Sequence, residues 1–168
     1  MELQASRTLA RAAPDGAPIL LQDQDRRRWD RLLIRRGLAA LDRAEGTFGP
    51  YVLQASIAAC HARAARAEDT DWRRIAALYE VLTHVSPSPV VDLNRAVAVG
   101  HAYGPARGLE IVDSLGLPGY ALLPAVRGDL LAKLGRAAEA RQEFEHAASI
   151  TRNARERALF EARAAALR

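Results

Sequence analysis

Three carboxylates in residues 20–37 are the groups of this sequence that come nearest to a catalytic or metal-binding site. Asp23, Asp25 and Asp30 could act as a general acid and base, or ligate a cation through oxygen, if a cleft shielded them from water. Asp25, however, precedes a helical pattern and is a good N-cap, and Asp30 stands among arginines that would keep it ionised and solvated. We therefore expect no catalysis there.

The other reactive side chains form no recognisable constellation. The four histidines lie far apart in the sequence, and none stands four residues from another metal ligand in a known motif. Cys60 and His61 are adjacent, so on a helix they would point about 100° apart and could not act as nucleophile and base. We predict that the chain is not an enzyme and that it holds no metal or cofactor.

Arginines give residues 26–36 a basic sector, in which Arg27, Arg31 and Arg35 would share one helical face. This face could bind nucleic acid, or it could be the solvated side of a helix whose other side carries Trp29. The 24 basic residues face 20 acidic ones, which leaves a net charge of +4. Because no aromatic residues interleave with the arginines to stack bases, we favour the solvated face and expect no direct DNA binding.

Composition narrows the class of protein further. At 168 residues the chain is one domain or a compact repeat array. Cys60 is the single cysteine, so an intramolecular disulfide cannot form and a reducing cytoplasm is expected. No segment approaches the roughly 20 apolar residues of a membrane span, and residues 1–13 lack a signal-peptide core. We predict a cytoplasmic protein without a membrane partner.

Apolar residues follow a helical spacing along nearly the whole sequence. The pattern predicts a helix over 2–13 and a second over about 25–45, and we group residues 1–50 as an N-terminal helical segment. The apolar stripe of the second helix comprises Trp29, Leu32, Leu33, Ala40, Leu41 and Ala44.

Residues 51–168 carry a repeat. Residues 71–87, "DWRRIAALYEVLTHVSP", resemble the second helix of a tetratricopeptide repeat, and the same phase returns at 104–118 and 135–150. Ala96 and Gly128 are the small residues expected where paired helices touch. The sequence predicts an all-α fold of antiparallel helix pairs stacked as a tetratricopeptide-like solenoid, with the N-terminal segment packed on the repeats and a C-terminal capping helix over 153–167.

Five segments of the sequence, in order, are "LLQDQDRRRWDRLLI", "GPYVLQASIAACHA", "EDTDWRRIAALYEVL", "SPVVDLNRAVAV" and "GYALLPAVRGDLLAKLGRAAEAR". Together they resemble the C-terminal tetratricopeptide-repeat-like extension of bacterial extracytoplasmic-function sigma factors, which belong to the sigma-70 family. The resemblance implies a regulatory protein–protein interaction domain that acts in transcription initiation. The regions of a sigma factor that bind DNA and core polymerase do not fit before Leu20, so the chain resembles the extension alone.

Partners implied by this resemblance are the N-terminal sigma domains, RNA polymerase or a regulatory protein. In a solenoid, the first helix of each pair lines the concave face, which commonly holds a peptide or a neighbouring domain. Asn94 and Arg95 stand on an otherwise apolar helix, and they either bind such a partner or satisfy carbonyls within the fold. A nucleic-acid-binding module and a small-ligand sensor remain alternatives. The candidate partner-binding residues are Gln54, His61, Asn94, Arg95, His101 and Asp129.

Overall fold

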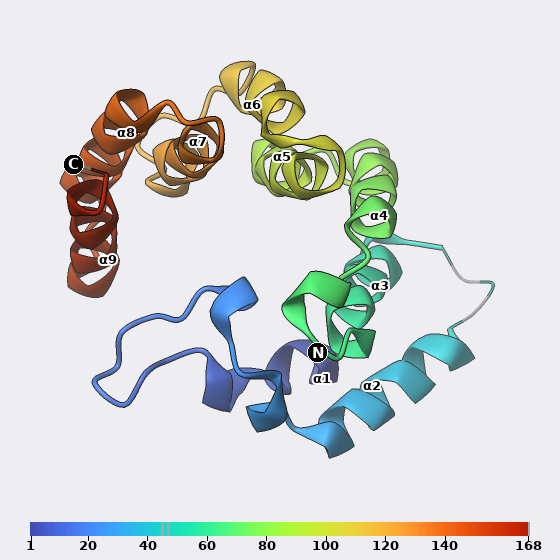
Figure 1. The fold of residues 1–168 in the computed structure, drawn as a ribbon. Coiled ribbons are helices and arrows are strands. Elements are labelled where there is room, and N and C mark those ends of the chain that lie inside the picture. Colours follow the sequence, from blue (N-terminus) through green and yellow to red (C-terminus); the bar gives the residue numbers. More distant parts are fainter. Residues whose placement is uncertain (45, 47, 168) are drawn as a thin grey trace. The chain divides into compact units, whose positions relative to one another are not determined.

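A computed structural model describes residues 1–44, 46 and 48–167, and this part of the chain is helical (Figure 1). It holds nine α-helices, α1 to α9, and four short 3₁₀ turns, and its β-type pairing is a single isolated bridge between Ala12 and Pro18. The prediction of an all-α fold is therefore confirmed for the described residues. The chain divides into two compact units, Met1–Ser86 and Pro87–Arg168, and each is described by itself.

The first unit begins with short elements instead of the helix predicted over 2–13. Helix α1 spans Glu2–Ala5, and a 3₁₀ turn follows at Thr8–Ala10. The Ser6 hydroxyl donates a hydrogen bond to the Leu3 carbonyl at 2.9 Å, and the Ser6 carbonyl accepts one from the Asp30 amide at 2.9 Å. Because the Ser6 carbonyl is bound to a distant part of the chain, it cannot serve a continuing helix.

The predicted helix from residue 25 is also divided. A 3₁₀ turn occupies Arg26–Arg28, and helix α2 spans Arg31–Arg43. Asp30 Oδ1 accepts hydrogen bonds from the Leu32 and Leu33 amides at 2.8 and 3.0 Å, so Asp30 is the N-cap of α2. Asp25 caps only the 3₁₀ turn, through the Arg27 amide at 3.0 Å. The predicted end of the helix at residue 45 lies outside the described residues.

This division changes which side chains face the core. Trp29 lies before α2 in extended conformation and is 3% exposed, whereas Leu32, which was expected in the same stripe, is 54% exposed. Ile34 and Gly37 are the buried residues of α2. The stripe predicted from Trp29 is wrong for Leu32 and for Ala40, which is also exposed. Helix α2 starts only at Arg31, so Trp29 does not share its phase.

Two longer helices complete the first unit. Helix α3 spans Pro50–Arg63 and helix α4 spans Trp72–Val85, with a 3₁₀ turn at Ala67–Asp69 between them. Helices α1 and α2 both contact α3, which also packs along α4 (Figure 1). The core of the unit joins the N-terminal elements to small residues of α3. Its buried members are Leu3, Ala10, Trp29, Ile34, Ala58, Ala59 and Ala62.

The second unit consists of two helix pairs and a last helix. Helix α5 (Pro89–Tyr103) is followed at once by α6 (Pro105–Asp113), and α7 (Leu122–Lys133) by α8 (Ala137–Ile150). Gly104 and Gly135 occupy the connections with φ of 102° and 75°, a left-handed backbone that glycine adopts without strain. Connections this short make each pair antiparallel.

Small residues set the distance within each pair. A Cβ on Gly108 of α6 would lie 2.7 Å from the Ala96 carbonyl oxygen of α5, and one on Gly128 of α7 would lie 3.1 Å from the Phe144 ring of α8. The predicted contacts at Ala96 and Gly128 are confirmed. Helix α9 (Ala154–Ala165) packs along α8 and is capped by Asn153, whose Oδ1 accepts from the Arg155 amide at 3.0 Å.

Candidate functional site

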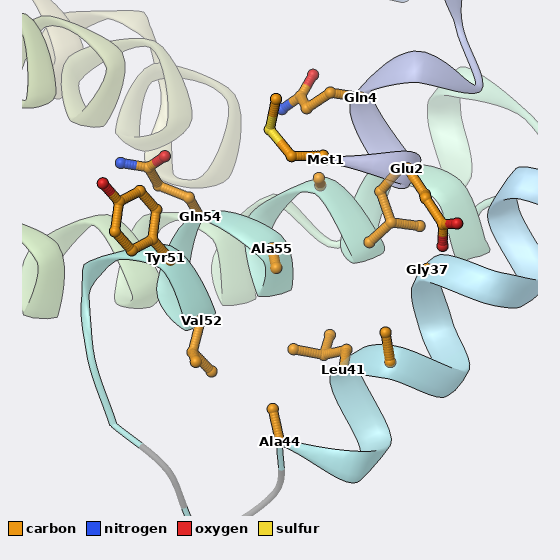
Figure 2. A pocket seen from close by; sticks show the side chains of 13 residues that line it. Met1, Glu2, Gln4, Gly37, Leu41, Ala44, Tyr51, Val52, Gln54 and Ala55 are labelled. Atoms are coloured by element: carbon orange, nitrogen blue, oxygen red, sulfur yellow. The ribbon is translucent and has the colours of Figure 1, made fainter.

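A groove in the first unit lies between α1, α2 and α3 and encloses about 560 Å³ (Figure 2). Leu41 of α2 and Ala44, which follows the end of α2, project toward Val52 of α3, and Met1 lies on the α1 side. Leu3 of α1 also lines the groove. The volume falls within the range of about 300–1,000 Å³ that holds small molecules or buried side chains of a partner. Most of the side chains that line the groove are apolar.

Small residues explain why the groove is open. Gly37 lets α1 approach α2 so closely that a Cβ there would lie 2.7 Å from Leu3 Cγ. Farther along, the facing positions are Ala40 and Ala44 on α2 and Ala55 on α3, whose methyl groups are too short to fill the space between the helices. The groove therefore follows from close contact at one end of the helices and short side chains at the other.

Apart from Glu2, the side chains that line the groove are apolar or uncharged. Tyr51 is 84% exposed, although it is a large side chain that folding normally covers. Gln4 and Gln54 contribute side-chain amides, as Figure 2 shows. Glu2 is the charged lining residue, and Arg36 neutralises it through an ion pair of 2.9 Å. A surface depleted of charge with exposed large side chains is typical of the centre of a protein interface.

The groove holds no catalytic arrangement, because its lining lacks a nucleophile beside a base. Within the described residues, no three His, Cys, Asp or Glu side chains are placed to hold a metal ion together. What the groove can do is take up apolar side chains and bind the polar edge of a ligand through Gln4 and Gln54.

Arg26 joins the N-terminal elements to the end of α3, one of the helices that form the groove. Its Nη1 donates to the His61 and Ala64 carbonyls at 2.5 and 2.9 Å, and its Nη2 donates to Thr70 Oγ1 at 3.0 Å. The guanidinium lies 4.9 Å from the centroid of the Trp29 ring. Burial lowers the pKa of Arg26, while Asp69 and Glu68 act in the opposite direction.

Arg26 was expected in the solvated basic sector, and that expectation is wrong, since its side chain is buried. A tertiary contact with α3 causes this burial. The last carbonyls of α3 have no partner within their own helix, and this guanidinium supplies one. Nothing in the pattern around residue 26 distinguishes it from the exposed Arg27 and Arg28, because its acceptors lie 35 or more residues away along the chain.

The basic face predicted from Arg27, Arg31 and Arg35 is only partly formed. Arg31 and Arg35 are exposed and lie one turn apart on α2. Arg27 precedes that helix, on the 3₁₀ turn, and pairs with Asp25 at 3.1 Å. The expected spacing of three arginines is therefore wrong for Arg27, because the helix begins at Arg31.

The two candidate partner-binding residues of the first unit have different surroundings. Gln54 is exposed on α3 and lines the groove. His61 is buried near the end of α3, where its ring meets Trp72 edge-on with 5.3 Å between the centroids. The structure therefore brings Gln54 to the groove and places His61 in the packing between α3 and α4.

The other four candidates belong to the second unit. Asn94 is exposed, and its side-chain amide donates to the Val90 carbonyl one turn earlier on α5 at 3.0 Å. Arg95 forms an ion pair of 3.6 Å with Asp92 one turn earlier on α5. Asp129 of α7 pairs with Arg163 of α9, so it fastens the last helix to the unit. Whether these residues contact a partner stays a prediction.

His101 lies in the last turn of α5, close to the last residue of α7. Its Nε2 is 3.4 Å from Lys133 Nζ. Burial, and to a lesser extent the positive charge of Lys133, lowers the pKa of His101 to about 4. The imidazole is therefore neutral in the folded unit at neutral pH and is the acid-sensitive group of this contact.

We expect His101 to weaken the second unit as the pH falls from about 6.5 to about 4, because the unfolded chain binds the proton in this window and the folded unit does not. Below the folded pKa the loss reaches its limit. His101→Gln should make the urea midpoint less dependent on pH, and Lys133→Met should do so in part by raising the pKa of His101. An unchanged pH dependence in His101→Gln would contradict this assignment.

No helix within the described residues is both long enough and apolar enough to cross a membrane. Residues 1–45 match a family model described as a family of unknown function (DUF6596), so the match includes the α1 and α2 walls of the groove. An uncharacterized protein of Rhizobium meliloti (strain 1021) is 51% identical over 160 residues, which cover 93% of this chain and 38% of that protein. The chain thus spans less than two-fifths of the length of this curated relative. No solved structure matches the chain.

Proposed function

We propose that this chain is the regulatory protein–protein interaction domain of an alternative sigma factor, and that its helix pairs stack as a tetratricopeptide-like solenoid. The sequence resemblance in five ordered segments supports this function. The pairs α5–α6 and α7–α8, with small residues at their contacts, support the repeat architecture. The relative's much greater length leaves room there for further domains with which this region would interact.

The apolar groove between α1, α2 and α3 is the observation that carries the proposal. An interaction domain needs a surface where burial of apolar area favours association, and the groove combines such a floor with the exposed Tyr51. We assign the groove to an apolar segment of the N-terminal sigma domains, of RNA polymerase or of a regulatory protein. The segment would place its side chains between Leu41 and Val52.

Deletion of the region that matches residues 20–168 from the full-length Rhizobium relative should change transcription from its promoter, because regulation by this domain is lost. Ala55→Arg at the matching position should reproduce that change, since a guanidinium in the groove would weaken docking by about 2 kcal/mol or more. Transcription reconstituted with purified polymerase measures both effects.

Ala39→Arg is the matched control for Ala55→Arg, because Ala39 is exposed on α2 and does not line the groove. The control should transcribe like the unaltered protein. Unchanged transcription after the deletion would refute the proposed function, whereas a phenotype of the deletion without one in Ala55→Arg would refute only the groove as its docking surface.

The volume of the groove also favours a second candidate, a sensor of a small apolar ligand. A ligand that binds only the folded state raises the melting temperature. A thermal-shift screen of small apolar compounds would show such a rise, and Ala55→Arg should abolish it if the groove is the binding site.

A further inference from the structure

Two arginines beside the groove lack a carboxylate partner. Arg7 Nη2 donates to the Gln4 side-chain oxygen, and Arg11 Nη2 donates to the Gln4 carbonyl at 2.8 Å. Arg7 also lies over the Trp29 ring, 5.8 Å from its centroid. None of the ion pairs within residues 1–44, 46 and 48–167 includes either arginine. Their contacts are therefore with neutral groups.

The surroundings of these two arginines are electropositive. Arg26 contacts the same Trp29 ring as Arg7, so guanidinium groups gather around one indole. Burial lowers the pKa of Arg7, and the charges of Arg11 and Arg26 lower it further, while Tyr79 acts in the opposite direction. Like charges this close repel each other, and a bound anion would relieve the repulsion.

Gln4 connects this cluster to the groove. It lines the groove beside Met1, as Figure 2 shows, and it also holds both arginines. Arg7 is half-buried and held in place by two contacts, whereas Arg11 is exposed. Both guanidinium groups are therefore one hydrogen bond away from Gln4, a residue that lines the groove.

We propose that Arg7 and Arg11 bind the carboxylate of an aspartate or glutamate in the protein segment that occupies the groove. This inference rests on the proposed function. It specifies the partner segment as one with apolar side chains that enter the groove and an acidic residue at the α1 end. Guanidinium groups suit this role because their planar donors match the two oxygens of a carboxylate.

The surroundings favour an acidic protein segment over a nucleic acid. The surface that adjoins the arginines is an apolar groove, which complements aliphatic side chains and not a sugar–phosphate backbone. Trp29, the aromatic ring of the cluster, is buried and covered by Arg26, so it cannot stack on a base.

Two peptides test the assignment with the full chain. The first is a fluorescein-labelled helical peptide with leucine along one face and glutamate beside that face, and the second carries glutamine at each glutamate. By fluorescence anisotropy the glutamate peptide should bind about threefold to fivefold more tightly, as expected for a partly exposed ion pair, and the difference should shrink as salt is added.

Arg11→Gln should remove the preference for the glutamate peptide, because Arg11 is the accessible member of the pair. Arg31→Gln removes the same charge from an exposed site on α2 and should keep the preference. The exposed side chain of Arg11 donates to the Gln4 carbonyl, and its other hydrogen bonds are made by the backbone, so its replacement should leave the melting temperature unchanged. Equal affinity of the two peptides, or equal effects of the two substitutions, would overturn the proposal.

Further outcomes separate the arginine site from the groove. Loss of both peptides in Ala55→Arg without a glutamate preference in the unaltered chain would leave the groove standing and refute the arginine site. A preference that depends on Arg11 but survives Ala55→Arg would support the arginine site and refute the groove. A single-stranded DNA that competes with the peptide through Arg11, or failure of both peptides to bind, would overturn the proposal.

Discussion

Gly108→Ala should destabilise the unit Pro87–Arg168 by about 2–3 kcal/mol, although alanine is the better helix former. The added Cβ would lie 2.7 Å from the Ala96 carbonyl oxygen and 3.0 Å from the Gly100 Cα. Both are backbone atoms, so no side chain can rotate away, and α5 and α6 must separate. Urea denaturation of the full chain, followed by circular dichroism, measures the loss.

Two other glycines calibrate this result. A Cβ on Gly116 meets nothing within 4 Å, so Gly116→Ala is the matched control and should leave the urea midpoint unchanged. Gly128→Ala should have an intermediate effect, because its Cβ would press at 3.1 Å on the ring of Phe144, which can shift, and at 3.2 Å on the Ala140 carbonyl. Equal stability of the Gly108 and Gly116 variants would show that the two helices do not pack as tightly as described.

Arg26→Gln should destabilise the unit Met1–Ser86 by about 3 kcal/mol, the order expected when one partner of a buried, charge-assisted hydrogen-bond network is removed. The side chain is 7% exposed and donates to two carbonyls and a hydroxyl. Glutamine is too short to reach all three acceptors, so carbonyls at the end of α3 would lose their partner. Urea denaturation measures the loss.

Arg28→Gln is the matched control, because Arg28 is exposed on the same 3₁₀ turn and its replacement removes the same charge. It should change stability by less than about 0.5 kcal/mol. Arg26→Lys should retain only part of the stability, since an ammonium lacks the planar fork that reaches acceptors on both sides. If Arg26→Gln and Arg28→Gln had the same urea midpoint, the buried network would have no role in stability.

The helical pairs of the second unit could be predicted because their signals are local. Apolar spacing indicated the helices, and small residues at Ala96 and Gly128 indicated where the pairs touch. Gly104 and Gly135 lie where the expected turns require a positive φ. Each of these signals spans a few neighbouring residues, so the sequence contains them without knowledge of the tertiary contacts.

The division at Trp29 was harder to predict, because two acceptable caps stand five residues apart. Asp25 was predicted as the cap, whereas Asp30, a residue type equally suited to capping, was interpreted as a solvated carboxylate among arginines. The structure selects Asp30 for α2, since the Asp30 amide is bound to the Ser6 carbonyl and the Trp29 side chain is buried. A contact with the first elements of the chain thus decides a helix boundary.

The sequence by itself determined the helical class, the paired helices of the second unit and the absence of a recognisable catalytic motif, because periodicity, capping and motif spacing are properties of adjacent residues. Only the tertiary structure decided that Arg26 is buried, that Gln54 lines a groove and that Gln4 holds Arg7 and Arg11 beside it. The physical reason is distance along the chain. The surroundings of each of these side chains come from residues that are remote in the sequence or that approach only when the segment folds. The arginines of one charged run therefore cannot be distinguished before their tertiary contacts are known.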